Sequence, residues 1–222
     1  MTSVDQLSQQ PTSKTSAVES DTKQQDNNND VLFPIVGIIA SAGGLEAVTE
    51  LLKYLHTDTD MAFVLIQHLS PNYKSQLAEI LTRATQLPVT QVRDRMVMEK
   101  NHVYVIPPNT KMILSQGVLQ LSPREKVSGK YMPGDAFLRS LAIDRGTKAI
   151  AVVLSGMDGD GSLGLTAIKE AGGMTFSQCE ATAKFDSMPN TAVATGNVDF
   201  VLTPQKIAEK LASFSRDFKH SD

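Results

Sequence analysis

The chain has 222 residues, a formal net charge of −3, and 41% hydrophobic and 20% charged residues, a composition typical of a soluble globular protein. The slightly acidic balance gives no electrostatic reason to bind nucleic acid. No apolar run approaches the ~18 residues of a membrane span. The single cysteine, Cys179, excludes an internal disulfide framework, and with the lack of a signal-peptide pattern it predicts a cytoplasmic protein without membrane insertion.

The N-terminal segment differs in composition from the rest of the chain. Residues 1–31 are rich in Ser, Thr, Gln, Asn and Asp and contain no aromatic residue. Such a segment buries too little apolar surface to offset the entropy of ordering it. We therefore predict a disordered polar tail over 1–31, one domain over 32–214, and a C-terminal tail or the start of a linker over 215–222.

Within the domain, short apolar runs alternate with patterns of helical period. Strands are predicted over 35–40, 61–66, 103–106, 149–154 and 199–202. Helices are predicted to begin at residues 43–48 and to cover 75–83, 135–144, 162–171 and 204–213. The runs 111–114 and 118–121 flank Gln116-Gly117 and predict a β-hairpin.

Continuously apolar strands that alternate with helices are typical of parallel sheets buried on both faces. The sequence therefore predicts an α/β fold: a doubly wound, mostly parallel sheet with helices on both faces and a β-hairpin addition. In such folds, functional groups gather beyond the C-terminal ends of the strands.

Three polar residues stand at predicted strand ends: Ser41, His68 and Asp160. Ser41 lies where an apolar strand meets a glycine-rich turn and the positive end of a helix. A hydroxyl, an imidazole and a carboxylate at one sheet edge are the parts needed for nucleophilic catalysis. The spacing thus favours a Ser-His-Asp site.

Each of these residues also has a structural interpretation. A serine in such a turn can cap the helix or hold a phosphate, and a histidine after a strand is often structural. The other histidines are less suited to meet Ser41, since His56 lies at a helix end, His102 precedes a strand, and His220 is near the C-terminus.

The loop after the longest strand holds two acids, Asp158 and Asp160, and either could cap the helix that begins near Ser162. Paired aspartates also suggest a metal site, but the loop lacks the oxygen spacing and distant glutamate of a calcium hand. We therefore predict neither a metal nor a cofactor.

Two features further along the chain have mainly structural interpretations. Asp135 follows Pro133-Gly134 and is predicted to be a helix N-cap. The basic residues Arg124, Lys126 and Lys130 of the predicted 122–133 loop are more typical of a solvated surface than of a binding patch.

The glycine-rich turn at 37–44 also resembles a phosphate-binding loop. No Lys-Ser/Thr pair follows its last glycine, and it lacks the Gly-x-Gly-x-x-Gly register of dinucleotide sites. The acids available for a ribose, Asp58 and Asp60, precede the second strand instead of ending it. Nucleotide binding is therefore the weaker hypothesis.

Ordered motifs over residues 34–213 resemble the catalytic domain of CheB-type chemotaxis receptor methylesterases. They are GIIASAGG at 37–44, IQHLSP at 66–71, VYVIPPN at 103–109, PGDAFLRSLA at 133–142, LSGMDGDG at 154–161, AGGMTFSQ at 171–178 and SMP at 187–189. This family hydrolyses glutamate γ-methyl esters on receptor helices and deamidates certain glutamines.

The resemblance implies that Ser41 is the nucleophile, His68 the base and Asp160 the acid that orients it. It also implies that the backbone N–H of Met157 contacts the oxyanion. The expected partners are the cytoplasmic helices of methylated chemoreceptors or a related signalling protein. The expected enzyme is a protein-glutamate methylesterase, with protein-glutamine glutaminase activity as a linked prediction.

Two departures from the family pattern qualify these expectations. Family members typically carry an N-terminal receiver domain, for which about 30 polar residues are too few. We therefore expect no control by an aspartyl phosphate in cis, and the lone catalytic domain resembles those of methylesterase/methyltransferase fusions. Ala42 replaces the threonine of many relatives, which removes a hydroxyl beside Ser41. The rival hypothesis is a non-catalytic interaction domain that keeps the fold.

Overall fold

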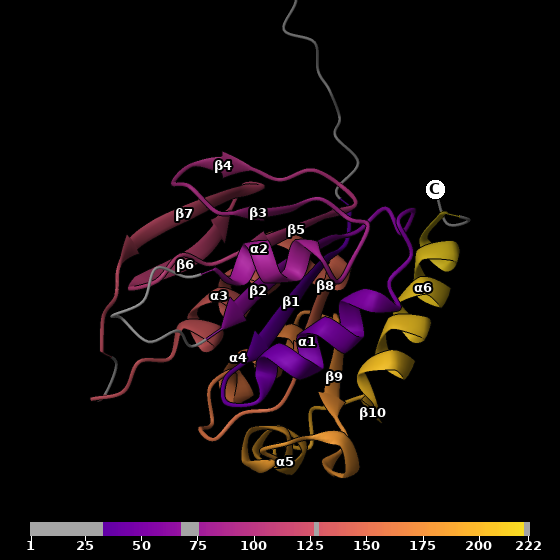
Figure 1. The fold of residues 1–222 in the computed structure, drawn as a ribbon. Helices are drawn as coiled ribbons and strands as arrows, with labels where there is room; N and C mark the ends of the chain where they lie inside the picture. Colours follow the sequence, from indigo (N-terminus) through magenta and orange to yellow (C-terminus); the bar gives the residue numbers. More distant parts are fainter. Residues whose placement is uncertain (1–32, 68–75, 127–128, 220–222) are drawn as a thin grey trace, which may run out of the picture. The chain divides into compact units, whose positions relative to one another are not determined.

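The computed structural model describes residues 33–67, 76–126 and 129–219 of the chain. Its centre is a parallel sheet of seven strands in the order β10-β9-β8-β1-β2-β5-β3 (Figure 1). The strands are β1 (Ile35–Ala40), β2 (Ala62–Gln67), β3 (Val89–Gln91), β5 (His102–Val105), β8 (Ala149–Val153), β9 (Met174–Gln178) and β10 (Phe200–Leu202).

Six α-helices connect or follow these strands. They are α1 (Gly44–Lys53), α2 (Leu77–Thr82), α3 (Pro133–Arg145), α4 (Ser162–Glu170), α5 (Ser187–Ala194) and α6 (Pro204–Lys219), with short 3-10 turns η1 (Gly146–Lys148) and η2 (Glu180–Thr182). The last helix continues beyond Ser213, where the sequence pattern ends it. None of the described helices is long and apolar enough to span a bilayer.

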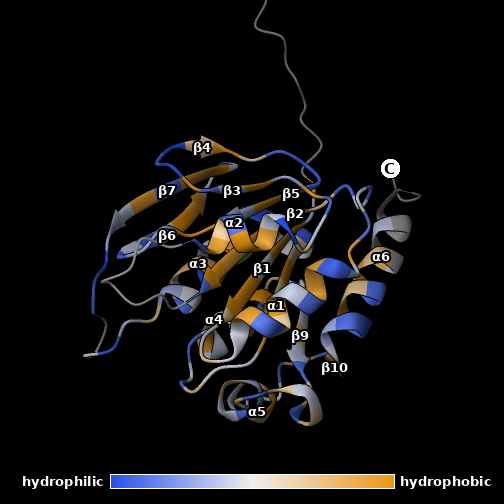
Figure 2. Cartoon of the chain, in the orientation of Figure 1, coloured by the Kyte–Doolittle hydropathy of each residue, from blue (hydrophilic) through white to orange (hydrophobic). Residues whose placement is uncertain are grey.

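Two separate hydrophobic clusters cover the two faces of the sheet. One face packs against α1, α2 and α6, through side chains such as Leu51 and Leu211. The other packs against α3, α4 and α5, through side chains such as Leu141 and Leu165. In Figure 2 the central strands are coloured as strongly hydrophobic, as expected for strands buried on both sides. The predicted doubly wound α/β fold is confirmed.

The predicted hairpin is also confirmed, as part of a smaller antiparallel sheet. Strands β6 (Thr110–Ser115) and β7 (Val118–Pro123) pair around Gln116 and Gly117, and β4 (Met96–Val97) adds to β7. Gln116 and Gly117 both adopt positive φ, of 51° and 74°, as a tight two-residue turn requires. Met112, Leu114 and Leu119 join this sheet to the cluster on the α3 face.

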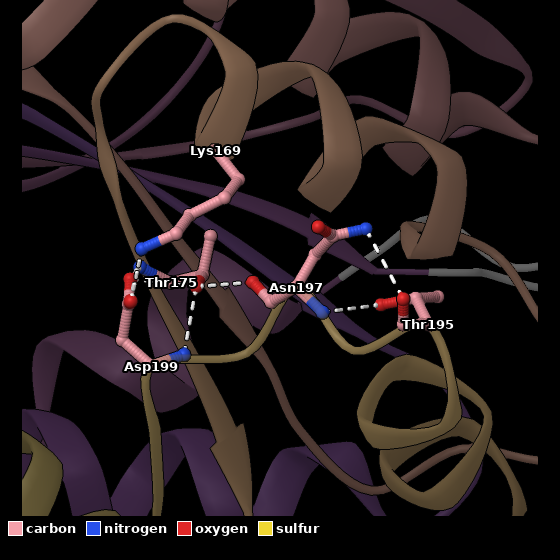
Figure 3. A network of polar contacts seen from close by, with 5 residues as sticks. All are labelled: Lys169, Thr175, Thr195, Asn197 and Asp199. Carbon is pink, nitrogen blue, oxygen red and sulfur yellow. Dashed lines mark hydrogen bonds and ion pairs between the residues drawn. The ribbon is translucent and has the colours of Figure 1, made fainter.

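One strand that the apolar pattern does not predict is β9, because three of its five residues, Thr175, Ser177 and Gln178, are polar. Its polar side chains are buried and hydrogen-bonded instead of exposed. Thr175 and Asp199 exchange hydrogen bonds, Asp199 pairs with Lys169 at the end of α4, and the Thr175 hydroxyl donates to the Asn197 carbonyl over 2.6 Å (Figure 3). This polar network joins the N-terminal ends of two neighbouring strands, β9 and β10.

The order of the strands creates one switch point. From β1 the chain passes through α1 to β2 on one side, and from β8 it passes through α4 to β9 on the other side. Because α1 and α4 lie on opposite faces of the sheet, they diverge from the C-terminal ends of two neighbouring strands. A crevice at such a point is the usual ligand site of open α/β sheets.

Candidate active site

Ser41 lies at this switch point, directly after β1. Its N–H donates to the Ser155 carbonyl over 3.0 Å, and its carbonyl accepts the N–H of Gly44 at 2.9 Å. Gly43 between them adopts a φ of 68°, and a Cβ there would lie 2.8 Å from Ser155 Oγ. Only glycine therefore suits this position, and the turn places Ser41 immediately before the N-terminus of α1.

The loop after β8 comes close to Ser41 from the neighbouring strand. A Cβ on Gly156 would lie 3.0 Å from Ser41 Cβ and 2.5 Å from Met188 Sδ, so only glycine allows this approach. Met157 follows, with 64% of the residue exposed. Within the described residues, no hydrogen bond occupies the backbone N–H of Met157 or of Ala42. Two peptide N–H groups beside the serine are thus available to a ligand oxygen.

Ser155 fixes the relative position of these loops, although the sequence analysis did not single it out. Its fully buried hydroxyl donates to the Ala42 carbonyl over 2.9 Å and accepts the Phe185 N–H at 3.0 Å. Its own N–H donates to Gln178 Oε1 over 2.9 Å. The sequence signal for this role is weak: a small polar residue directly after the longest apolar strand.

Asp160 lies in the same loop and is fully buried. Its two carboxylate oxygens accept the N–H groups of Gly134 at 2.8 Å and Asp135 at 2.9 Å. These groups are in the first turn of α3, so the carboxylate sits at the positive end of that helix. Asp158 accepts the Asp160 N–H at 3.2 Å. Asp160 therefore caps a helix, but α3 and not the helix that follows it.

The prediction that Asp135 is an N-cap is wrong. Helix α3 begins at Pro133, so Asp135 lies inside its first turn, and its carboxylate accepts the Gly164 N–H of α4 at 2.8 Å. The local pattern misled because the cap of α3 comes from Asp160, 25 residues further along the chain. Burial raises the pKa of Asp135 above its ordinary value, and the neighbouring Asp160 charge adds to this rise.

Among the histidines, His68 lies outside the described residues, immediately after β2. Register pairs Gln67, the last residue of β2, with Ala40, the residue before Ser41. His102 lies at the start of β5, among the N-terminal ends of the strands, whereas Ser41 follows the C-terminal end of β1. It stacks on Tyr104 and shares a 2.8 Å hydrogen bond with Thr90. His102 is therefore remote from Ser41. Within the described residues, no cluster of three or more His, Cys, Asp or Glu could hold a metal ion.

The family model for the CheB methylesterase matches residues 36–211. This chain belongs to the CheB methylesterase family. A solved structure of the family, the Thermotoga maritima CheB methylesterase catalytic domain, is 28% identical with a TM-score of 0.76 and covers 83% of this chain and 100% of that chain.

Two curated relatives extend this comparison. A protein-glutamate methylesterase/protein-glutamine glutaminase of Rhizobium meliloti is 33% identical over 183 residues, which is 82% of this chain and 52% of that protein. An uncharacterized 104.1 kDa protein of Rhodobacter capsulatus is 39% identical over 138 residues, 62% of this chain and 14% of that protein. The chain thus spans about half, or less, of the length of these relatives.

Proposed function

We propose that this domain hydrolyses glutamate γ-methyl esters on a protein, with Ser41 as nucleophile, His68 as base and Asp160 as the acid that orients the base. The observation that carries the proposal is the switch point itself. There Ser41 directly follows β1, beside two peptide N–H groups, those of Ala42 and Met157, that donate to no acceptor within the described residues.

In this mechanism His68 takes the proton of the Ser41 hydroxyl as its oxygen attacks the ester carbonyl. The tetrahedral intermediate collapses, methanol leaves with the proton from His68, and an acyl-enzyme remains. Water activated by His68 then releases the glutamate carboxylate. Asp160 holds the imidazole in the required tautomer, a role that its place in the loop motif at 154–161 supports.

The negative oxygen of the intermediate would be held by the N–H groups of Met157 and Ala42. One such donor typically contributes about 3 kcal/mol to stabilisation of the transition state. The fixed loops support this role, because Ser155 holds the Ala42 carbonyl and Gly156 contacts Ser41. Donors that do not move during the reaction stabilise charge without reorganisation.

The same acyl-enzyme pathway would deamidate selected glutamines, with ammonia in place of methanol as the leaving group. The proposed substrates are cytoplasmic helices of methylated chemoreceptors, or of a related signalling protein. The domain would span 32–214 and act in the cytoplasm. The two proposed activities are those in the name of the Rhizobium meliloti relative, a protein-glutamate methylesterase/protein-glutamine glutaminase.

The direct test is methanol release from methylated receptor membranes of the same organism. We expect release by the wild-type protein and a loss of at least about 1,000-fold in Ser41→Ala and Asp160→Asn. Asp158→Asn is the matched control, because it changes the neighbouring acid of the same loop and keeps an oxygen that can accept the Asp160 N–H. That variant should remain active.

An organophosphonate serine probe separates a missing substrate from a missing nucleophile. Labelling of wild type and not of Ser41→Ala, without methanol release, would indicate an active serine that acts on another ester. A folded wild-type protein that neither labels nor releases methanol would reject the hydrolase and favour the non-catalytic interaction domain.

A further inference from the structure

A small pocket borders the candidate active site on the side of β2. Its lining includes Gln67, Asn109, Thr110, Arg124 and Pro133. Gln67 is the strand partner of Ala40, which precedes Ser41. Pro133 precedes the two N–H groups that bind Asp160. Two walls of the pocket thus come from β2, which pairs with the strand before Ser41, and from the start of α3, whose first turn binds Asp160.

Arg124 occupies the third wall in a fixed position. Its backbone N–H donates to the Asn109 carbonyl over 3.1 Å, and its guanidinium carbon lies 3.7 Å from the centroid of the Tyr131 ring. Lys126 Nζ is 5.4 Å from the same ring and adds a second positive charge. Stacking on an aromatic face restrains an arginine and leaves its N–H edge free to bind a partner.

The guanidinium of Arg124 has no anionic partner among the described residues. The nearest acid in sequence, Glu125, pairs instead with Lys111 at 3.4 Å. A second polar group in the pocket is also unsatisfied, because buried Gln67 Oε1 accepts no hydrogen bond from any residue that the structure describes. A buried acceptor without a donor is costly in a folded protein. The pocket therefore presents unused donors and an unused acceptor within one small space beside the site.

We propose that Arg124, held by Tyr131, is a specificity-determining residue that binds a carboxylate of the substrate segment next to the methyl ester. This inference rests on the proposed function and adds the chemistry of the substrate around the reacting group. A planar guanidinium matches a carboxylate through two parallel hydrogen bonds. A segment with several methylation sites supplies such carboxylates, since every hydrolysed ester leaves one.

The test measures binding, so that it does not depend on turnover. Two fluorescent peptides each carry one central glutamate γ-methyl ester. The first has glutamates one helical turn on either side of the ester, and the second has glutamines there. Their Kd values are measured by anisotropy with the Ser41→Ala protein, and then with the same protein carrying Arg124→Gln.

We expect the Ser41→Ala protein to bind the glutamate peptide about tenfold more tightly than the glutamine peptide, as for a charge-assisted hydrogen bond. Arg124→Gln should reduce this preference to about one- to twofold, which is the signature of direct coupling between the two groups. Arg83→Gln is the matched control. It removes the same charge from an exposed residue after α2, which lies near the C-terminal end of α1 and does not line this pocket, and should keep the preference.

Equal affinity for the two peptides in the Ser41→Ala protein would overturn the proposal. So would a preference that survives Arg124→Gln, since another cation would then bind the carboxylate. Failure of the proposed function looks different: the wild-type protein would release no methanol from either peptide, whatever the binding preference. The two proposals can therefore fail separately.

Discussion

At the scale of single residues, the position of the Ser41 turn depends on a second serine, Ser155. The Ser155 hydroxyl donates to the Ala42 carbonyl and accepts the Phe185 N–H, and the Ser155 carbonyl accepts the Ser41 N–H. These contacts join strands and loops that lie far apart in the sequence. Ser155 is thus a positioning residue for the proposed nucleophile.

We predict that Ser155→Ala lowers kcat for methyl ester hydrolysis about tenfold and changes KM little, because the turn loses a restraint that orients the reacting groups. It should also cost about 1–3 kcal/mol in the free energy of unfolding, since the Phe185 N–H loses its acceptor. Steady-state kinetics and urea unfolding measure the two effects.

Ser177→Ala provides the control for this prediction. Ser177 is also fully buried and donates to the Pro189 carbonyl over 3.1 Å, but among the described residues it shares no hydrogen bond with the Ser41 turn. Its substitution should lower stability by a similar amount and leave kcat unchanged. An equal fall of kcat in both variants would show that lost stability, and not lost positioning, slows the reaction.

At the scale of elements, two aspartates each bind the N-terminal end of the other's helix. Asp160 precedes α4 and caps α3, whereas Asp135 lies in α3 and accepts an N–H from α4. The local sequence could indicate that both helices need caps, but not that each is capped from the other. Such long-range pairing depends on how α3 and α4 pack, which a pattern within one segment does not contain.

Because the pKa of Asp135 is raised, its contribution to the free energy of unfolding depends on pH. Its folded pKa lies above the unfolded value, so the stability that Asp135 contributes at low pH is lost as the pH rises through the folded pKa. Asp135→Asn does not titrate and keeps an oxygen for the Gly164 N–H. The stability deficit of this variant relative to wild type should therefore shrink between about pH 4 and pH 7. Urea unfolding at both pH values measures this change.

Asp199 should show the opposite trend. Burial opposes its ionisation, but hydrogen bonds from Lys169 and Thr175 outweigh burial and hold the pKa of Asp199 below its ordinary value (Figure 3). Its contribution is thus present above the unfolded pKa and is lost as the pH falls through the folded pKa. The deficit of Asp199→Asn should be larger at about pH 7 than at about pH 3. A deficit that grows towards low pH would contradict this assignment.

The network around Asp199 also explains what the sequence could not reveal about the sheet. Strands such as β1 and β8 are continuously apolar and are predicted directly. In β9, Thr175, Ser177 and Gln178 are buried because partners from other segments satisfy them. No hydrophobic period marks such a strand. The position of Ser41, the proposed nucleophile, is by contrast marked by local signals, because a strongly apolar strand precedes it and a glycine turn follows it.

At the scale of the whole molecule, the two hydrophobic clusters lie on opposite faces of one sheet. Leu51 of α1 belongs to one cluster and Leu141 of α3 to the other. We predict that Leu51→Ala and Leu141→Ala each cost about 2–5 kcal/mol in the free energy of unfolding. The double variant should lose the sum of the two values, because the residues share no contacts.

Ile143→Ala is the control for this pair, since Ile143 lies on α3 close to Leu141 but is 89% exposed. Its cost should stay within about 0.5 kcal/mol. Urea unfolding of the four variants provides the free energies. If the loss in the double variant departs clearly from the sum, the packing on the two faces is energetically coupled through the sheet.

The switch point has a further consequence for how the protein is made. Ser41 leaves the ribosome before Gly156, Met157 and Asp160, which are added more than one hundred residues later. A nascent chain that ends before β8 has the proposed nucleophile. It lacks the proposed oxyanion donor, the N–H of Met157, and the proposed acid, Asp160. The proposed esterase is therefore inactive until the loop after β8 has been synthesised. A chain that terminates before this loop is an inactive product and not an unregulated hydrolase.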